Sequence, residues 1–166
     1  MEAESLSPAH AFALLLEIAC ENFELMQAII KQEIRIESSN MRASSCIQMA
    51  LAKYFIANVF RARRICKDDK TYLAVDKLEQ ERFIESIPAL PRVRNVNEHG
   101  YDVSNNRSKP SMHEHKLEGV ILDETSLIVL GPEKILMGPI NLFDLYHATE
   151  RMRELAGFKS LKEEIF

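Results

Sequence analysis

The chain has 166 residues, of which 46% are hydrophobic and 28% are charged, which suits one globular domain with a sizeable core. The formal net charge is -4 at pH 7. This balance argues against a protein that coats nucleic acid non-specifically, because such proteins are usually basic overall, but it permits a local basic patch.

Cysteine usage and the N-terminal sequence indicate the cellular setting. Cys20, Cys46 and Cys66 are far apart and lie in apolar helical patterns, without the CxxC spacing of a zinc knuckle or the even count of a disulfide framework. We therefore expect buried, reduced thiols. The acidic start lacks the basic residues of a signal peptide, and the most apolar run, 11–19, is too short to span a membrane. These features predict a cytoplasmic protein with no membrane partner.

The first predicted helix begins at Ser7-Pro8, with the serine as N-cap and the proline in the first turn. Apolar residues then recur at three- and four-residue steps, which predicts an amphipathic helix to about Ile36. The stripe consists of Phe12, Leu15, Ala19, Phe23, Met26 and Ile30.

A break at 38–40 precedes a second predicted helix, which runs to about Cys66. Two long helices with so short a link should pack antiparallel. The residues on or near its apolar stripe are Ile47, Leu51, Tyr54, Phe55, Asn58 and Val59.

The second helix ends in a basic cluster, formed by Arg61, Arg63, Arg64 and Lys67, with Lys70 just beyond. One interpretation is a solvated helix end, since cations there interact favourably with the helix dipole. The other is a basic patch beside a phosphate-handling site.

A third helix is predicted from about Ala74 to Ile87, with Leu78 and Phe83 on its apolar side. Prolines at 88 and 91 end or kink it. A short helical segment should follow from about 91 to 99, and Gly100 is a natural stop for that segment.

The last third of the chain changes character. A polar loop at 102–116 precedes short apolar runs at 120–122, 127–130 and 135–137, which predict a small antiparallel β meander. Asn141 should cap a final helix from about Leu142 to Ala156, with Asp144 in its first turn and Gly157 closing it. We thus expect one mainly α domain at 1–166, with a helical core at 7–101, a β appendage at 117–139 and a C-terminal helix at 141–157.

One stretch, 94–101, combines chemically useful groups between these apolar elements. Arg94 supplies a planar cationic fork that suits phosphate. His99 supplies a group that exchanges protons near neutral pH. Together with Asn95 and Tyr101 they indicate phosphate or phosphodiester chemistry.

The pattern Arg94-Asn95-x-x-x-His99-x-Tyr101 resembles the R-x4-6-H motif of HEPN domains, including the polar residue after the arginine. It also resembles the H-x-Y extension of HEPN toxins that pair with small nucleotidyltransferases. The setting agrees, because two long antiparallel helices and a shorter one precede the motif. The resemblance covers about residues 8–101 and implies an antiparallel helical bundle.

The resemblance implies a homodimer that cleaves RNA without a metal or other cofactor, in a cleft shared by two subunits. His99 would act as general acid or base, Arg94 would stabilise charge on the phosphate, and Asn95 would orient the phosphate or the imidazole. Tyr101 would be a modification site for a nucleotidyltransferase-type antitoxin. Candidate RNA-phosphate contacts are Arg61, Arg64 and Arg92.

Three alternatives remain open at this point. Arg94 pairs with Glu98 at i,i+4 while His99 caps a helix C-terminus, which gives the motif a structural role. A second is a non-catalytic HEPN-like module that binds a partner or a nucleotide. A third is a metal-dependent hydrolase that uses His99 with the H-x-H pair His113 and His115, since alternate strand residues share a face.

Overall fold

The computed structural model describes residues 7–32, 41–68, 71–95, 115–117, 120–122 and 125–157, with the backbone alone at 41–43, 115–117 and 120–122. In this part of the chain the protein is mainly helical, with a small three-stranded antiparallel sheet before the C-terminal helix. The predicted fold class is therefore confirmed at this level of detail.

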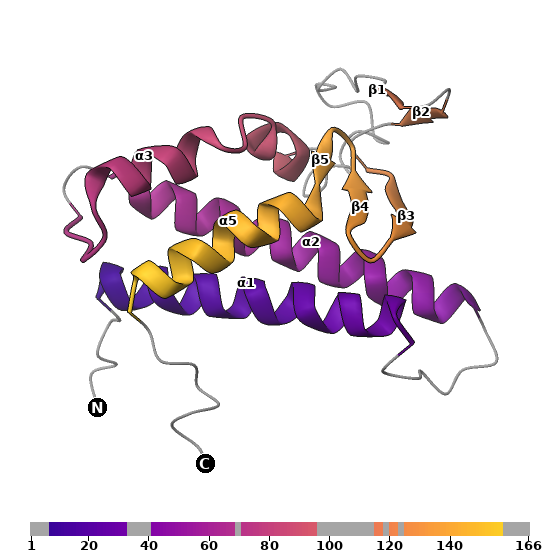
Figure 1. Cartoon of the computed structure of the whole chain (residues 1–166), viewed down its shortest axis with the longest axis horizontal. Helices are drawn as coiled ribbons and strands as arrows, with labels where there is room; N and C mark the ends of the chain where they lie inside the picture. Colours follow the sequence, from indigo (N-terminus) through magenta and orange to yellow (C-terminus); the bar gives the residue numbers. More distant parts are fainter. Residues whose placement is uncertain are drawn as a thin grey trace, which may run out of the picture.

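The two long helices are α1 (Pro8–Ile30) and α2 (Met41–Cys66), which run antiparallel along the length of the molecule (Figure 1). Ser7 caps α1 as predicted, because its hydroxyl accepts a hydrogen bond from the His10 amide at 3.3 Å. The predicted end near Ile36 is wrong. Gln32 adopts a left-handed backbone with φ 61°, which stops the helix after Ile30.

The third helix, α3 (Lys77–Glu85), is shorter at both ends than the predicted span of 74–87. It begins at Asp76, whose carboxylate accepts a hydrogen bond from the Leu78 amide at 2.8 Å and so fixes the N-terminus. Leu73 and Val75 before the cap are buried in non-helical backbone. A helical segment at 90–95 follows α3, in agreement with the prediction for this part of the motif.

The β region differs from the predicted meander in its pairing. The strand β2 (Val120–Leu122) pairs with β1 (His115–Leu117) in a separate two-stranded sheet, and not with β3 (Leu127–Gly131). The three-stranded sheet has the order β3, β4 (Lys134–Met137) and β5 (Ile140–Asn141). Gly138, with φ 54°, permits the tight turn between β4 and β5, which a branched side chain would strain.

The last helix, α5 (Leu142–Leu155), starts where β5 ends and crosses α1 towards its N-terminal half (Figure 1). Asn141 caps it as predicted, because its side-chain oxygen accepts from the Phe143 amide at 3.2 Å. Asp144 lies in the first turn, and Gly157 after the end has φ 69°.

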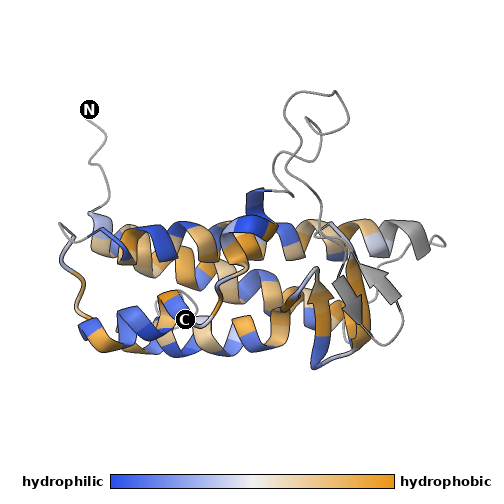
Figure 2. Cartoon of the chain, turned by 90° about the horizontal axis from the view of Figure 1, so that it is seen from above, coloured by the Kyte–Doolittle hydropathy of each residue, from blue (hydrophilic) through white to orange (hydrophobic). Residues whose placement is uncertain are grey.

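The core lies between α1, α2 and α5 and continues to the inner side of β4. Coloured by hydropathy, the helices carry apolar and polar residues on different faces, and the β3–β5 sheet is largely apolar (Figure 2). The largest fully buried side chains are Phe12, Leu16, Phe23, Met26, Phe55, Ile56, Leu90, Ile135, Met137, Leu142, Leu145 and Met152. No helix in the described ranges is long and apolar enough to cross a membrane.

Some predicted core positions are wrong. Tyr54 is 63% exposed and Leu78 is 54% exposed, because each lies on the outer side of its helix. Cys46 is exposed, whereas Cys20 and Cys66 are buried as expected. Burial raises the pKa of each buried thiol to about 12, so both are unreactive near neutral pH.

Phe23 is the residue on which we expect the fold to depend most strongly. Its ring is fully buried, with centroids 5.3 Å from Phe55 and 4.6 Å from Tyr146. Phe23→Ala should lower the free energy of unfolding in urea by about 3–5 kcal/mol, since it removes a large core side chain. Leu25→Ala on the exposed side of the same helix should cost far less. Equal losses in both variants would contradict this core.

Candidate functional site

Arg94 lies on the helical segment 90–95, whose inner side anchors it to the core. Leu90 and Val93 have no exposed surface, while Arg92 and Arg94 are partly exposed and Asn95 is exposed. Since residues three apart share a helix face, the two apolar anchors turn the arginines towards the surface.

The contacts of the Arg94 guanidinium include an aromatic ring and a neighbouring side-chain amide. Its Cζ atom lies 4.9 Å from the centroid of the Phe60 ring on α2, and its Nη1 donates a hydrogen bond to Asn95 Oδ1 at 2.9 Å. Stacking uses the face of the guanidinium, and the N–H donors lie in its plane. The contact with Phe60 is not visible in the sequence, because 34 positions separate the two residues.

The second half of the motif lies outside the described residues. This applies to His99 and Tyr101, to Glu98 as the alternative partner of Arg94, and to His113. The backbone of His115 belongs to β1, but its side chain is not described. Among the described residues no group of three or more His, Cys, Asp or Glu could hold a metal ion. The predicted catalytic pair and the three-histidine metal site both stay predictions.

Charge is segregated between the two long helices, a feature that the overall net charge hides. Helix α2 contains five basic residues and no Asp or Glu, whereas α1 contains three Glu and no Lys or Arg. Lys53, Arg61 and Arg64 are exposed and lie within about 80° of one another around α2. We name these three residues the basic face of α2. The exposed Tyr54 borders it.

Arg63 does not belong to this surface, although it stands between Arg61 and Arg64 in the sequence. Its side chain is buried at 8% exposure, and its Nε donates to the Ile84 carbonyl oxygen at 3.1 Å. Ile84 lies in the last turn of α3, so the cation satisfies a carbonyl at a helix C-terminus. Burial lowers the pKa of Arg63. The predicted basic cluster therefore divides into a structural arginine and a surface group.

Arg61 and Arg64 line an open pocket of about 540 Å³ where the C-terminal end of α2 meets the N-terminus of α1. Pro8 is the first residue of α1 and also lines it. Arg64 follows Phe60 by one helical turn, and Arg94 stacks on Phe60. Arg64 therefore lines the pocket together with Arg61 and also lies one turn along α2 from the ring that Arg94 contacts.

A polar cluster between α1 and α5 was not predicted from the sequence. The Tyr146 hydroxyl lies 2.9 Å from Glu150 Oε1 and 3.1 Å from Glu24 Oε1. A phenol has one proton, so it donates to one carboxylate at a time. Burial and the two neighbouring carboxylates raise the pKa of Tyr146 above its usual range. Tyrosine is therefore the proton donor of this cluster.

Arg153 is the cation of the same cluster. Its guanidinium nitrogens lie 3.7–3.8 Å from oxygens of Glu17, Glu24 and Glu150. Burial alone would lower the pKa of Arg153, but the surrounding anionic groups outweigh it and the pKa is raised. Glu17 is 2% exposed. In the sequence, Glu17 interrupts the apolar run 11–19, and a charged residue at such a position is a signal for a buried ion pair.

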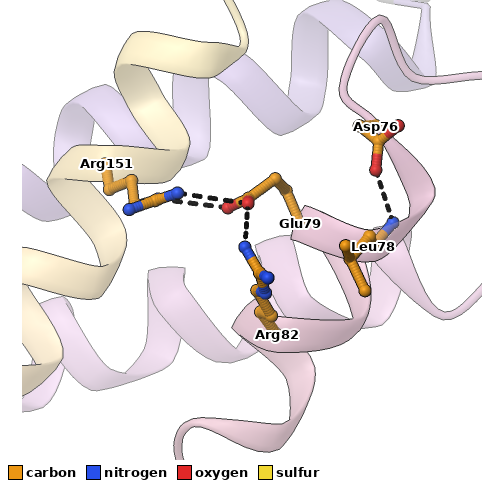
Figure 3. A network of polar contacts seen from close by, with 5 residues as sticks. All are labelled: Asp76, Leu78, Glu79, Arg82 and Arg151. Carbon is orange, nitrogen blue, oxygen red and sulfur yellow. Dashed lines mark hydrogen bonds and ion pairs between the residues drawn. The ribbon is translucent and has the colours of Figure 1, made fainter.

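A second ionic cluster joins α3 to α5. Arg151 donates from Nε and Nη2 to the two oxygens of Glu79 at 3.1 Å each, and Arg82 Nη1 donates to Glu79 Oε1 at 2.6 Å (Figure 3). The three side chains border a pocket of about 220 Å³ with Phe83 and Met152 among its apolar residues. The two guanidinium groups are engaged by one carboxylate, so this cluster primarily fixes α5 against α3.

The sequence matches no protein-family model, and no curated protein or solved structure matches it either. The resemblance to HEPN domains therefore depends on the motif at 94–101 and its helical setting.

The Glu79 cluster predicts a pH dependence of stability. Hydrogen bonds from Arg151, and then from Arg82, hold the pKa of Glu79 below its ordinary value of 4.5. A carboxyl with a depressed pKa in the folded state stabilises the fold above its unfolded pKa, and this contribution is lost as the pH falls through the folded value. Glu79→Gln should therefore lower the melting temperature near neutral pH, and the difference should shrink as the pH falls well below 4.5.

Glu81→Gln, at an exposed position on the same helix, is the matched control for this measurement. Its melting temperature should follow that of the wild type near neutral pH. The same pH profile for both variants would show that Glu79 contributes no more than any surface carboxylate.

Proposed function

We propose that the chain is a HEPN-like, metal-independent endoribonuclease in which Arg94 and His99 of two subunits share one cleft. The observation that supports this best is the stacking of Arg94 on Phe60, at 4.9 Å from the ring centroid. An active site needs its charged groups held in one geometry before substrate arrives, and an aromatic partner restricts the long arginine side chain.

Each residue of the motif has a defined role in this proposal. Metal-free RNA cleavage requires activation of the 2′-hydroxyl and stabilisation of negative charge on the phosphorane. His99 transfers the proton as general acid or base, and Arg94 stabilises the charge. Asn95 accepts a hydrogen bond from Arg94 Nη1, which supports a role in orienting the guanidinium.

The basic face of α2 supports RNA as the substrate. Lys53, Arg61 and Arg64 project from a helix without any acidic residue, and Tyr54 is 63% exposed beside them. Basic residues attract the phosphate backbone, and an exposed aromatic ring offers a surface on which a base can stack. Arg92, on the segment that carries Arg94, is the further candidate for a phosphate contact.

The proposal also includes the partners that the resemblance implies. The protein acts as a homodimer in the cytoplasm, and Tyr101 is the site at which a nucleotidyltransferase-type antitoxin would modify it. A non-catalytic binding module and a metal site at His99, His113 and His115 are the competing outcomes of the experiment below.

The first test measures cleavage of a mixed-sequence RNA by the purified full chain in EDTA. Arg94→Ala and His99→Ala should each lower the rate about 10²-fold or more, as removal of a charge-stabilising or proton-transferring group does. Arg94→Lys should also be impaired, because lysine keeps the charge but loses the planar fork. Size-exclusion chromatography with light scattering checks that each variant remains a dimer.

Arg82→Ala is the control, since Arg82 is paired with Glu79 on α3. It should cleave RNA at the wild-type rate. Equal cleavage by all variants would refute a catalytic role for the motif, and the absence of cleavage in the wild type would favour a binding module. Activity that EDTA abolishes and a divalent metal restores would favour the histidine metal site.

The second test concerns Phe60 as a positioning residue. Phe60→Leu retains apolar volume but removes the ring, and cleavage should fall about 3- to 30-fold, in line with roughly 0.5–2 kcal/mol for a cation–π contact. Phe60→Tyr keeps the ring and should retain most of the activity. The loss should appear in kcat more than in KM, because the substrate still meets the same charges. Equal rates for the Leu and Tyr variants would exclude the stacking contact as a positioning device.

A further inference from the structure

The pocket between the N-terminus of α1 and the C-terminal end of α2 has the features of a site for a small anion. It has a volume of about 540 Å³, within the range of roughly 300–1,000 Å³ that small-molecule sites occupy. Arg61 and Arg64 line it from one helix, three residues apart and therefore on adjacent positions of its surface.

The two arginines are available to a ligand. Within the part of the chain that the structure describes, neither the Arg61 nor the Arg64 guanidinium makes a hydrogen bond or an ion pair. Arg63, Arg82 and Arg153 behave differently, since each donates to an oxygen or lies beside a carboxylate. The arginines that stabilise this fold are thus engaged, and the two in the pocket are not.

The charge of the pocket indicates how much negative charge a ligand should carry. Asp68 also lines the pocket, so the side chains contribute two positive charges and one negative charge. The partial positive charge at the N-terminus of α1, about +0.5, is opposed by the partial negative charge of about −0.5 at the C-terminal end of α2, so the total charge of the pocket stays near +1. A phosphate monoester carries about −1.5 to −2 near pH 7, which matches this total better than a triphosphate does.

The remaining lining residues suit the organic part of such a ligand. Leu15 and Ile65 provide apolar surface, and Thr71 provides a hydroxyl that donates to Asp68 Oδ2 at 3.1 Å. This arrangement leaves room for a sugar or a base beside the arginines.

We propose that this pocket binds a nucleoside monophosphate group, with Arg61 and Arg64 on the phosphate. The group is either a free mononucleotide or the 5′-phosphorylated end of an RNA, which present the same chemistry. The site shares Arg61 and Arg64 with the RNA-contacting basic face of α2 proposed above, but its occupancy does not require cleavage of RNA.

The test measures binding of AMP, adenosine and ATP to the purified full chain by isothermal titration calorimetry. AMP should bind at least tenfold more tightly than adenosine, and ATP should show no tenfold gain over AMP. The double variant Arg61→Gln/Arg64→Gln should weaken AMP binding at least tenfold. Both side chains are exposed, so the fold should persist, which circular dichroism checks.

The matched control is Lys31→Gln/Arg82→Gln, which removes the same charge from exposed positions outside the pocket. It should leave AMP binding within about twofold of the wild type. Asp68→Asn keeps an acceptor for Thr71 but removes the negative charge, and it should tighten AMP binding. Adenosine binding as tight as that of AMP, or equal weakening by both double variants, would overturn the proposal.

Two hexaribonucleotides distinguish the sources of the phosphate, one with a 5′-phosphate and one with a 5′-hydroxyl. Both are 2′-O-methylated, so that neither can be cleaved and a failure of the proposed nuclease does not affect the result. A preference of tenfold or more for the phosphorylated hexamer that the arginine double variant removes assigns the site to RNA ends. AMP binding without such a preference assigns it to free mononucleotides. If neither AMP nor the phosphorylated hexamer binds, the site does not exist.

Discussion

The stacking of Phe23 on Tyr146 is the contact on which the arrangement of the helices depends. It joins the first long helix to the last one, with ring centroids 4.6 Å apart, and the ring of Phe55 on α2 lies 5.3 Å from Phe23. Three helices therefore meet at one buried ring. The polar end of Tyr146 must then lie between α1 and α5, which explains why Glu24 and Glu150 form a hydrogen-bonded cluster with it.

The position of the candidate site follows from this helix packing. α5 is held against α3 by Glu79 and Arg151, and α3 is held against α2 by the bond from Arg63 to the Ile84 carbonyl. The segment 90–95 follows directly, with Leu90 in the core. These contacts fix α5, α3 and α2 relative to one another. The burial of Leu90 then holds the segment 90–95 against the core, where Arg94 contacts Phe60.

Much of the fold could be predicted from local sequence signals. Ser7, Asn141 and Gly157 mark helix ends through their own backbone and side-chain chemistry, and the structure confirms all three. The early end of α1 could not be predicted, because Gln32 carries no sequence signal for a left-handed backbone. The pairing of β2 with β1 depends on contacts between strands, which periodicity does not specify.

The candidate site was less predictable, because it depends on contacts between residues that are far apart in the sequence. Arg61, Arg63 and Arg64 form one basic cluster in the sequence, but helical rotation sends Arg63 into the core and the other two to the surface. The contact of Arg94 with Phe60 joins two helices and has no local signature. Residue type and spacing identified the arginines as candidates. Only the packing of the helices determines that Arg63 is buried, that Arg61 and Arg64 are exposed and that Arg94 contacts Phe60.

The net charge of −4 is a poor guide to what this surface attracts. Salt at physiological strength screens exposed charges beyond about 8 Å, so an anion near α2 responds to that helix and little to the glutamates of α1 and α5. Helix α2 has no acidic residue, and its partner α1 has no basic one. A chain that is acidic on average can therefore present a basic local face at Lys53, Arg61 and Arg64.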